Sequence, residues 1–527
     1  MSGHDAVTAQ RRAADPTGSA WVAANAGSGK TRVLTERVAR LLLDGARPEK
    51  ILCLTYTKAA AAEMQNRLFA MLGGWAMAED AEIGAALASL TGGAAPAGED
   101  ALDRARRLFA EALETPGGLK IQTIHAFCDN LLRRFPLEAG APPDFRVMEE
   151  REQRVLIAEV LEAMAARPGP DCDAFRGLAA ILDEGGIEAR AAAVVRDRAL
   201  FPNPPDEPAI SAAFGVAWPP EEAAARIAAF AAVDGRALSR MIVAWGAGAK
   251  TDQNRAVALD EAAERGEDDL AIQLMDAMLK KDGAPRAKPA SKAAQAAEPD
   301  WARLCAHLTD AALAIREAGT AAAAAEKSLR LARFGGAFAA AYEAAKTARS
   351  LLDFDDLVGK ARALLTAGPA RDWVLYRLDG GVDHVLVDEA QDTSPAQWDV
   401  IDAIASEFRA GDGVRDAGGP AGRRTSFVVG DEKQSIYSFQ GAAPGKFDEM
   451  RRRFKEGLAP HGGQNEVALT HSFRSAPAIL RAVDAVFAGE RAVGLTAGGA
   501  PPVHAAFHDG RAGRVELWPL IEPEADP

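Results

Sequence analysis

The residues best suited to chemistry form a glycine-rich octapeptide near the start of the chain. They match the pattern G-x-x-x-x-G-K-[ST] with alanine at its first position: Ala24, Asn25, Ala26, Gly27, Ser28, Gly29, Lys30 and Thr31. Glycines let backbone N–H groups curve around a phosphate without Cβ clashes. We expect Lys30 to reach the β- and γ-phosphates of ATP and the Thr31 hydroxyl to bind Mg²⁺. A chance glycine-rich loop is the alternative, but an apolar run precedes the octapeptide and a helical pattern follows it, as the motif requires.

Two adjacent carboxylates follow another apolar run, far along the chain. Val385–Val387 leads directly into Asp388 and Glu389. In a nucleotide hydrolase, Asp388 would hold Mg²⁺ and Glu389 would polarise the attacking water as a general base. Taken alone, the pair also suits a solvated helix start, where carboxylates are favoured. A phosphate loop in the same chain favours the catalytic interpretation.

A third apolar run, Phe427–Val429, is also followed by polar residues. The amide of Gln434 follows this run, where it could sense the γ-phosphate. Tyr437 and Phe439 come next, and exposed rings there would stack on bases, each contributing about 1–3 kcal/mol whatever the base. Ordinary core packing is the alternative for these two rings.

The motifs need a scaffold, and the pattern around them predicts one. Short apolar runs predict strands at 21–26, 51–55, 382–387 and 426–429, and helical patterns follow at Thr31–Leu43, from Ala59 to Gly73–Gly74, and at Ser394–Phe408. Alternating strands and helices predict an α/β phosphate-loop fold, a parallel sheet with helices on both faces. Ligands of such sheets bind at the carboxyl ends of the strands, where the motifs lie.

The interval between Lys30 and Asp388 is too long for one compact phosphate-loop domain, so it must hold an extra domain. From about 136 to 350 the chain is alanine-rich with helical periodicity, which predicts a large, mostly helical insertion. Within the insertion, the composition of residues 281–299 is typical of a flexible linker.

Composition bounds the class of protein. A chain of 527 residues exceeds one ordinary core, so several domains are expected. The four cysteines lie far apart without a C-x-x-C pair, which argues against a zinc ribbon, an iron–sulfur cluster or a disulfide framework and favours a reducing, cytoplasmic location. No apolar run is long enough to span a membrane, so no membrane partner is expected. The net charge of −14 still permits a local basic groove for nucleic acid.

Seven stretches, in order, resemble the ATPase core of superfamily 1 DNA helicases of the UvrD/Rep/RecB type. Their wording is closest to the AddA-type helicase–nuclease subunits. Any one stretch could match by chance, but the whole ordered set could hardly do so. The stretches are ANAGSGKT, LTYTKAAAAEM, IQTIHAFC, DFDDL, VLVDEAQDTSPAQW, GDEKQSIYSFQGA and LTHSFRSAP, between Gln10 and Pro477.

The resemblance assigns roles to further residues. It implies that Gln10 recognises adenine, that Gln434 couples the phosphate site to DNA and that Arg474 contacts the γ-phosphate. It also implies a set of side chains along single-stranded DNA, namely Thr55, Thr57, Lys58, Thr123, His125, Phe127, Tyr437 and Phe439.

The resemblance also implies domains and a function. The expected RecA-like motor domain 1A comprises 1–135 and 346–465, the helical domain 1B 136–345, and the beginning of a truncated second motor domain 2A 466–527. The implied activity is an ATP-dependent 3′-to-5′ DNA helicase of double-strand break repair and recombination. It would use ATP and Mg²⁺, track on single-stranded DNA from a duplex end and work with an AddB-type partner subunit.

Two alternatives stay open. Because the later motifs of the second motor domain and the nuclease domain are missing, we interpret the chain as the N-terminal portion of a longer motor. One alternative is therefore a nucleotide-dependent DNA-binding module without motor activity. The other is a phosphate-loop ATPase that is not a helicase, against which the TIHAF and QSIYSF stretches argue.

Overall fold

The chain folds into two compact units. The computed structural model describes residues 3–93, 99–182, 184–367, 369–379, 381–410, 424–436, 441–461, 463–495 and 502–519. The first unit joins Met1–Val147 to Leu352–Pro527, and the second is Met148–Leu351. The helical domain was expected at 136–345. The unit starts later because Ala141 and Phe145 are buried in the core of the first unit, and it ends later because Leu351 packs in the second.

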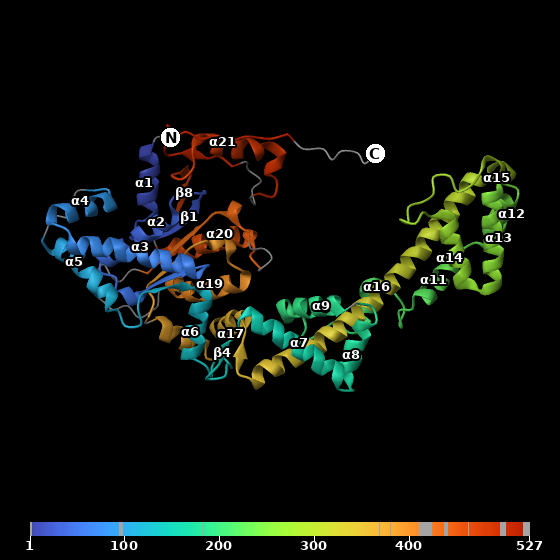
Figure 1. The fold of residues 1–527 in the computed structure, drawn as a ribbon, viewed down its shortest axis with the longest axis horizontal. Helices are drawn as coiled ribbons and strands as arrows, with labels where there is room; N and C mark the ends of the chain where they lie inside the picture. Colours follow the sequence, from blue (N-terminus) through green and yellow to red (C-terminus); the bar gives the residue numbers. More distant parts are fainter. Residues whose placement is uncertain are drawn as a thin grey trace. The chain divides into compact units, whose positions relative to one another are not determined.

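A six-stranded parallel sheet forms the centre of the first unit (Figure 1). Its strand order is β3 (Lys120–Thr123), β2 (Ile51–Thr55), β6 (His384–Val387), β7 (Thr425–Gly430), β1 (Ser19–Ala24) and β8 (Gln464–Leu469). The neighbouring strands are all parallel, which confirms the predicted α/β phosphate-loop fold. Strands β3 and β8 were not predicted, because their first residues are mostly polar. The expected start of domain 2A at residue 466 falls within β8.

Helices cover both faces of the sheet because alternate strand residues point to opposite faces. In β2, Leu52 and Leu54 pack in one apolar cluster, whereas Ile51 and Cys53 pack in the other. The first face carries α6 (Ile124–Arg134), α17 (Phe354–Thr366), α18 (Arg371–Asp379), α19 (Pro395–Ala410) and α20 (Pro444–Leu458). The second carries α1 (Gly3–Ala13), α2 (Lys30–Leu43), α3 (Lys58–Met77), α4 (Asp80–Thr91) and α5 (Glu99–Leu113).

Helix α3 does not end at Gly73–Gly74, where the sequence predicted its end, but continues to Met77. Leu72 and Trp75, on either side of the glycine pair, are buried against the second face. A Cβ on Gly73 would lie 3.4 Å from the Phe109 ring of α5. The glycine therefore serves close helix packing, and burial of its neighbours outweighs the weak helix propensity.

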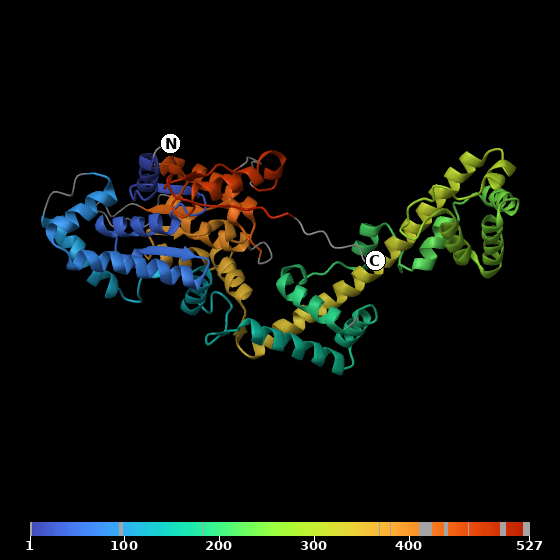
Figure 2. The same cartoon turned by 45° about the horizontal axis from the view of Figure 1, so that its top comes forward.

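The second unit is helical and is organised along one helix, α16 (Trp301–Ala348) (Figure 2). Three apolar clusters lie along α16, each shared with other helices. Those helices are α7 (Glu150–Ala166), α8 (Pro170–Ala179), α9 (Glu184–Arg196), α10 (Glu207–Phe214), α11 (Glu222–Phe230), α12 (Gly235–Gly246), α13 (Lys250–Arg265), α14 (Glu267–Met278) and α15 (Lys292–Ala297).

The expected flexible linker at 281–299 is wrong. It contains α15, which Ser291 caps through the Ala294 N–H, and Ala290 and Ala294 are buried. Buried Asp252 accepts a hydrogen bond from the Ser291 N–H at 3.0 Å. The small side chains let this segment pack closely against its neighbours. Its composition is typical of a linker, but its backbone is fixed by burial and hydrogen bonding.

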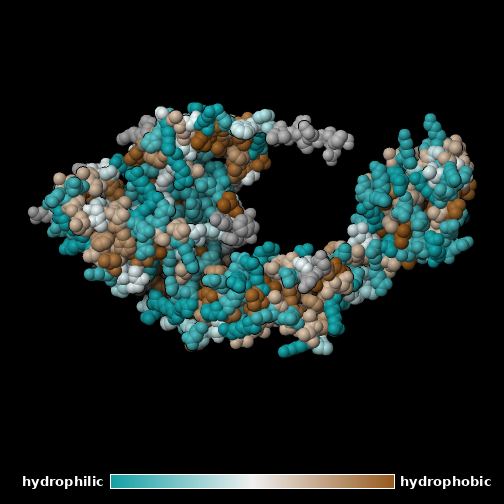
Figure 3. All heavy atoms as spheres, viewed as in Figure 1, coloured by the Kyte–Doolittle hydropathy of each residue, from teal (hydrophilic) through white to brown (hydrophobic). Residues whose placement is uncertain are grey.

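Short elements follow the sheet, namely β9 (His471–Ser472), α21 (Pro477–Val486) and β10 (Ala505–Ala506). Ile479, Val483 and Val486 are exposed along α21, and the space-filling view shows apolar surface in this region (Figure 3). The helices of the described residues are all too short or too polar to span a bilayer.

Candidate nucleotide and DNA site

The sheet brings the predicted site residues to one edge. Each of its six strands runs toward a segment singled out from the sequence, and all six carboxyl ends lie at that edge because the strands are parallel. The segments are the phosphate loop after β1, Thr55 ending β2, Thr123 ending β3, Asp388 after β6, Gln434 after β7 and Arg474 after β8.

The phosphate loop has the backbone that an anion site needs. Gly27 and Gly29 adopt left-handed φ angles of 72° and 86°, which favour glycine. Helix α2 begins at Lys30, so its unpaired N–H groups and positive dipole end face the loop. The buried Ser28 hydroxyl oxygen has no hydrogen-bond partner among the described residues. An anion with acceptor oxygens would satisfy these donors.

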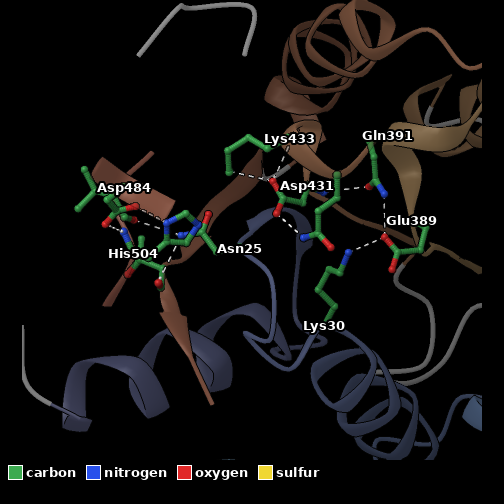
Figure 4. A network of polar contacts seen from close by, with 11 residues as sticks. Asn25, Lys30, Glu389, Gln391, Asp431, Lys433, Asp484 and His504 are labelled. Atoms are coloured by element: carbon green, nitrogen blue, oxygen red, sulfur yellow. Dashed lines mark hydrogen bonds and ion pairs between the residues drawn. The ribbon is translucent and has the colours of Figure 1, made fainter. Parts of the chain in front are cut away.

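A polar network links the ends of β1, β6 and β7 (Figure 4). Lys30 Nζ lies 2.5 Å from Glu389 Oε2, which also accepts a hydrogen bond from Gln391 Nε2 at 2.8 Å. Gln391 Oε1 in turn accepts one from the Asp431 N–H at 2.9 Å. A carboxylate oxygen of Asp431 accepts a hydrogen bond from Gln434 Nε2. Lys30, Glu389 and Gln434 are thus joined through two residues that were not singled out, Gln391 and Asp431.

The two adjacent carboxylates differ in environment. Burial, and next the charge of Glu389, raises the pKa of Asp388 to about 6, while Lys30 acts in the opposite direction. Asp388 Oδ1 accepts the Glu389 N–H at 3.0 Å. Glu389 has a φ of 48°, a left-handed conformation uncommon for a residue with a Cβ and typical of functional sites. A buried carboxylate with a raised pKa fits a hard cation such as Mg²⁺, which would restore its charge.

A small, open hollow lies beside the phosphate loop. Buried Gln10 lines it and donates from Nε2 to the Ser28 carbonyl at 2.8 Å. Phe473 lines it too, and its N–H donates to the Gly27 carbonyl at 2.8 Å. Adenine recognition by Gln10 stays a prediction. Phe473 was missed, although its place beside Arg474 in HSFRS was a signal.

Arg474 lies against the phosphate loop. A Cβ on Gly27 would lie 2.8 Å from the Arg474 Cβ, so only glycine allows this approach. The Arg474 residue itself is exposed, which leaves its guanidinium accessible to a ligand. Its γ-phosphate contact stays a prediction.

The predicted DNA-contact residues fall into different environments. Thr57 and Thr123 cap α3 and α6 by accepting the N–H groups of Ala60 and Ala126 at 3.1 and 3.2 Å. Thr55 is buried and donates to the Thr57 carbonyl, whereas Lys58 is exposed. Both threonine caps shape the edge of the sheet, whatever else they bind.

His125 packs edge-on against Phe354, with ring centroids 5.5 Å apart. Burial lowers its pKa, so its imidazole is neutral at physiological pH. Phe127 is buried in the core of the first face, where it packs instead of facing a ligand. Tyr437 and Phe439 lie outside the described residues.

Comparisons with known proteins agree with the motifs. The model of the UvrD/REP helicase N-terminal domain matches residues 6–455. Three similar proteins are named as the A component of an ATP-dependent helicase/nuclease. The one from Desulforudis audaxviator is 30% identical over 88% of this chain and 38% of its own length. The others, from Pelotomaculum thermopropionicum and Latilactobacillus sakei, are 28% and 27% identical over 89% and 90% of this chain. The chain spans 37% and 54% of these two relatives.

Proposed function

The chain belongs to the UvrD/REP helicase family, as its seven ordered stretches predicted, and on this premise we propose that it is the motor part of an ATP-dependent DNA helicase. We propose 3′-to-5′ polarity and a role in double-strand break repair, within an AddA-type protein that works with an AddB-type partner. The observation that carries the proposal is the meeting of the phosphate loop, Asp388, Glu389 and Arg474 at one sheet edge.

ATP would bind with its phosphates on the loop Ala24–Thr31 and its base toward Gln10. Thr31 and Asp388 supply the hard oxygens that would hold Mg²⁺, which when bound neutralises phosphate charge. Lys30 would then exchange its partner, leaving Glu389 for the phosphates. This exchange frees the Glu389 carboxylate to take the proton of the attacking water, while Gln391 keeps it oriented.

DNA would lie across the ends of β2 and β3, near Thr55, Thr57, Lys58, Thr123 and His125, with Tyr437 and Phe439 stacking on bases. The chain from Glu389 through Gln391 and Asp431 to Gln434 gives a physical route between the ATP and DNA sites. A change of partner at Glu389 would move the residues that precede Tyr437. Phosphate contacts make this binding sensitive to salt.

Steady-state ATP hydrolysis by the purified 527-residue chain, with and without single-stranded DNA, tests the proposal. DNA-stimulated turnover that disappears in Lys30→Ala is expected. Nucleotide binding without turnover would favour the DNA-binding module instead. Partial duplexes with a 3′ or a 5′ overhang then test polarity, and unwinding of only the 5′-tailed substrate would contradict it.

A further inference from the structure

The segment Val503–Arg511, here called the brace, contacts the phosphate loop and the loop that carries Phe473 and Arg474. We propose that the brace positions Phe473 and Arg474 on bound nucleotide, and that Phe507 of the brace and Asn25 of the phosphate loop act as positioning residues. This inference rests on the proposed function, because it concerns how that nucleotide site distinguishes ATP from ADP.

The backbone of the brace is hydrogen-bonded to the loop of residues 470–474, here called the arginine loop. Strand β10 runs parallel to β9, with Ala505 opposite His471 and Ala506 opposite Ser472. The Ala505 N–H donates to the Thr470 carbonyl at 3.3 Å, and the Phe507 N–H donates to the Ser472 carbonyl at 2.9 Å. The residue next to Phe473 is therefore held by a regular ladder and not by loop contacts alone.

Side chains of the brace hold both functional residues. The Phe507 ring stacks on the Phe473 ring with centroids 4.3 Å apart and planes at 29°. Phe473 also lines the hollow that contains Gln10. At the next residue of the arginine loop, Arg511 Nη1 donates to the Arg474 carbonyl at 2.8 Å. The brace thus adds contacts to both residues beyond those made by the phosphate loop.

Asn25 ties the phosphate loop to the brace. Its Nδ2 donates to the Thr470 carbonyl at 3.3 Å and to the Val503 carbonyl at 3.2 Å. The Asn25 side chain therefore links the phosphate loop to the arginine loop and to the brace. Figure 4 shows Asn25 beside His504, whose Nδ1 lies 2.5 Å from Asp484 Oδ1 and thereby fixes the brace on α21.

These contacts suit a site that must place a guanidinium accurately. The exposed Arg474 side chain is long, and ordering it on a γ-phosphate costs conformational entropy. Fixing its backbone at the phosphate loop, at Phe473 and at Arg511 reduces the positions it can sample. Because ADP lacks the γ-phosphate, weakening the brace should reduce affinity for ATP more than for ADP.

The test measures Kd values of the full chain for ADP and for ATP, the latter as an analogue whose β–γ bridge cannot be hydrolysed, by isothermal titration calorimetry with Mg²⁺. In Phe507→Ala and in Asn25→Ala we expect the ratio of the ADP Kd to the ATP Kd to fall about 3- to 10-fold, the size of one ring pair or one hydrogen bond. Phe507→Tyr keeps the stacked ring and should retain the parental ratio. Matched controls are Phe214→Ala and Asn254→Ala, on α10 and α13 of the helical unit.

Each outcome decides between the claims. If the parental chain binds neither nucleotide, the proposed function fails, and this inference fails with it. If it prefers ATP but Phe507→Ala keeps the full ratio, the brace inference alone is overturned. A loss of thermal stability in Phe507→Ala with an unchanged ratio would also overturn it, since a merely structural contact affects both nucleotides equally. A reduced ratio restored in Phe507→Tyr supports it.

Discussion

The carboxyl edge of the sheet and the helical unit Met148–Leu351 are built on different principles. At the edge, buried polar side chains gather, among them Gln10, Ser28, Asp388, Gln391 and Asp431. Within the described part of the helical unit, the buried polar residues are only Asp252, Glu298 and Lys346. Burying polar groups costs free energy unless they are paired. We infer that chemistry constrains the sequence of the first region and that packing constrains the sequence of the second.

Among the substitutions at the sheet edge, Lys30→Ala should reduce activity the most. The substitution removes a cation from the phosphate loop and leaves Glu389 with Gln391 as its remaining partner. We expect loss of nucleotide binding and at least about a 100-fold fall in ATP hydrolysis. Lys327→Ala, on α16 of the helical unit, is the control and should hydrolyse ATP at the parental rate. Equal effects of the two would remove the distinction between the regions.

Glu389→Gln separates binding from chemistry at the same edge. The amide retains the size of the side chain but cannot accept a proton, so ATP should still bind while turnover falls about 10²- to 10⁴-fold. Binding by calorimetry and hydrolysis by phosphate release check the two parts. Hydrolysis at the parental rate would show that Glu389 is not the base.

The two regions also differ in how far the sequence predicts them. Apolar runs located β1, β2, β6 and β7 because these strands are buried on both faces of a parallel sheet. The polar openings of β3 and β8 hid those strands, and only their pairing with neighbours makes them regular. Gln391 could not be found as the centre of a network because one of its partners, Asp431, lies after another strand and is distant in sequence.

In the helical unit, the sequence periodicity predicts helices but does not predict how these helices and their loops pack together. The alanine-rich composition hid the fixed loop before α15, whose order depends on Asp252, a residue distant in sequence. Phe127 presents the converse case at the edge. It belongs to a motif, yet its ring is in the core, so motif membership alone did not separate a contact residue from a packing residue.

Leu308→Ala tests whether packing in the helical unit affects stability without affecting the nucleotide site. Leu308 on α16 is fully buried in the cluster with α12, α13 and α14. Truncating it should lower the free energy of unfolding of the helical unit by about 2–5 kcal/mol through lost burial and a residual cavity. Calorimetric unfolding and ATP affinity are the measurements, and the affinity should not change where the unit stays folded. A matching loss of ATP affinity would show that packing in one unit controls chemistry in the other.

Asp388→Asn should change the free energy of unfolding less than Leu308→Ala does. It should raise this free energy, whereas Leu308→Ala lowers it. Because burial raises the pKa of Asp388 from 3.8 to about 6, the folded state binds this proton more tightly than the unfolded state. Its ionisation therefore lowers the free energy of unfolding progressively from about pH 4 to pH 6. Above about pH 6 the whole of this loss remains.

Without Mg²⁺ at pH 8, Asp388→Asn should thus unfold at higher urea, by on the order of 2 kcal/mol, although it loses hydrolysis. The gain should shrink as the pH falls through about 6 and vanish below about 4, where both side chains are neutral. Asp372→Asn, exposed on α18, is the control and should show no such pH dependence. A stability gain that is constant across this pH range would mean that the buried charge is not its source. Asp388 would then resemble Leu308 of the helical unit, because the shape of its side chain and not its charge would determine stability.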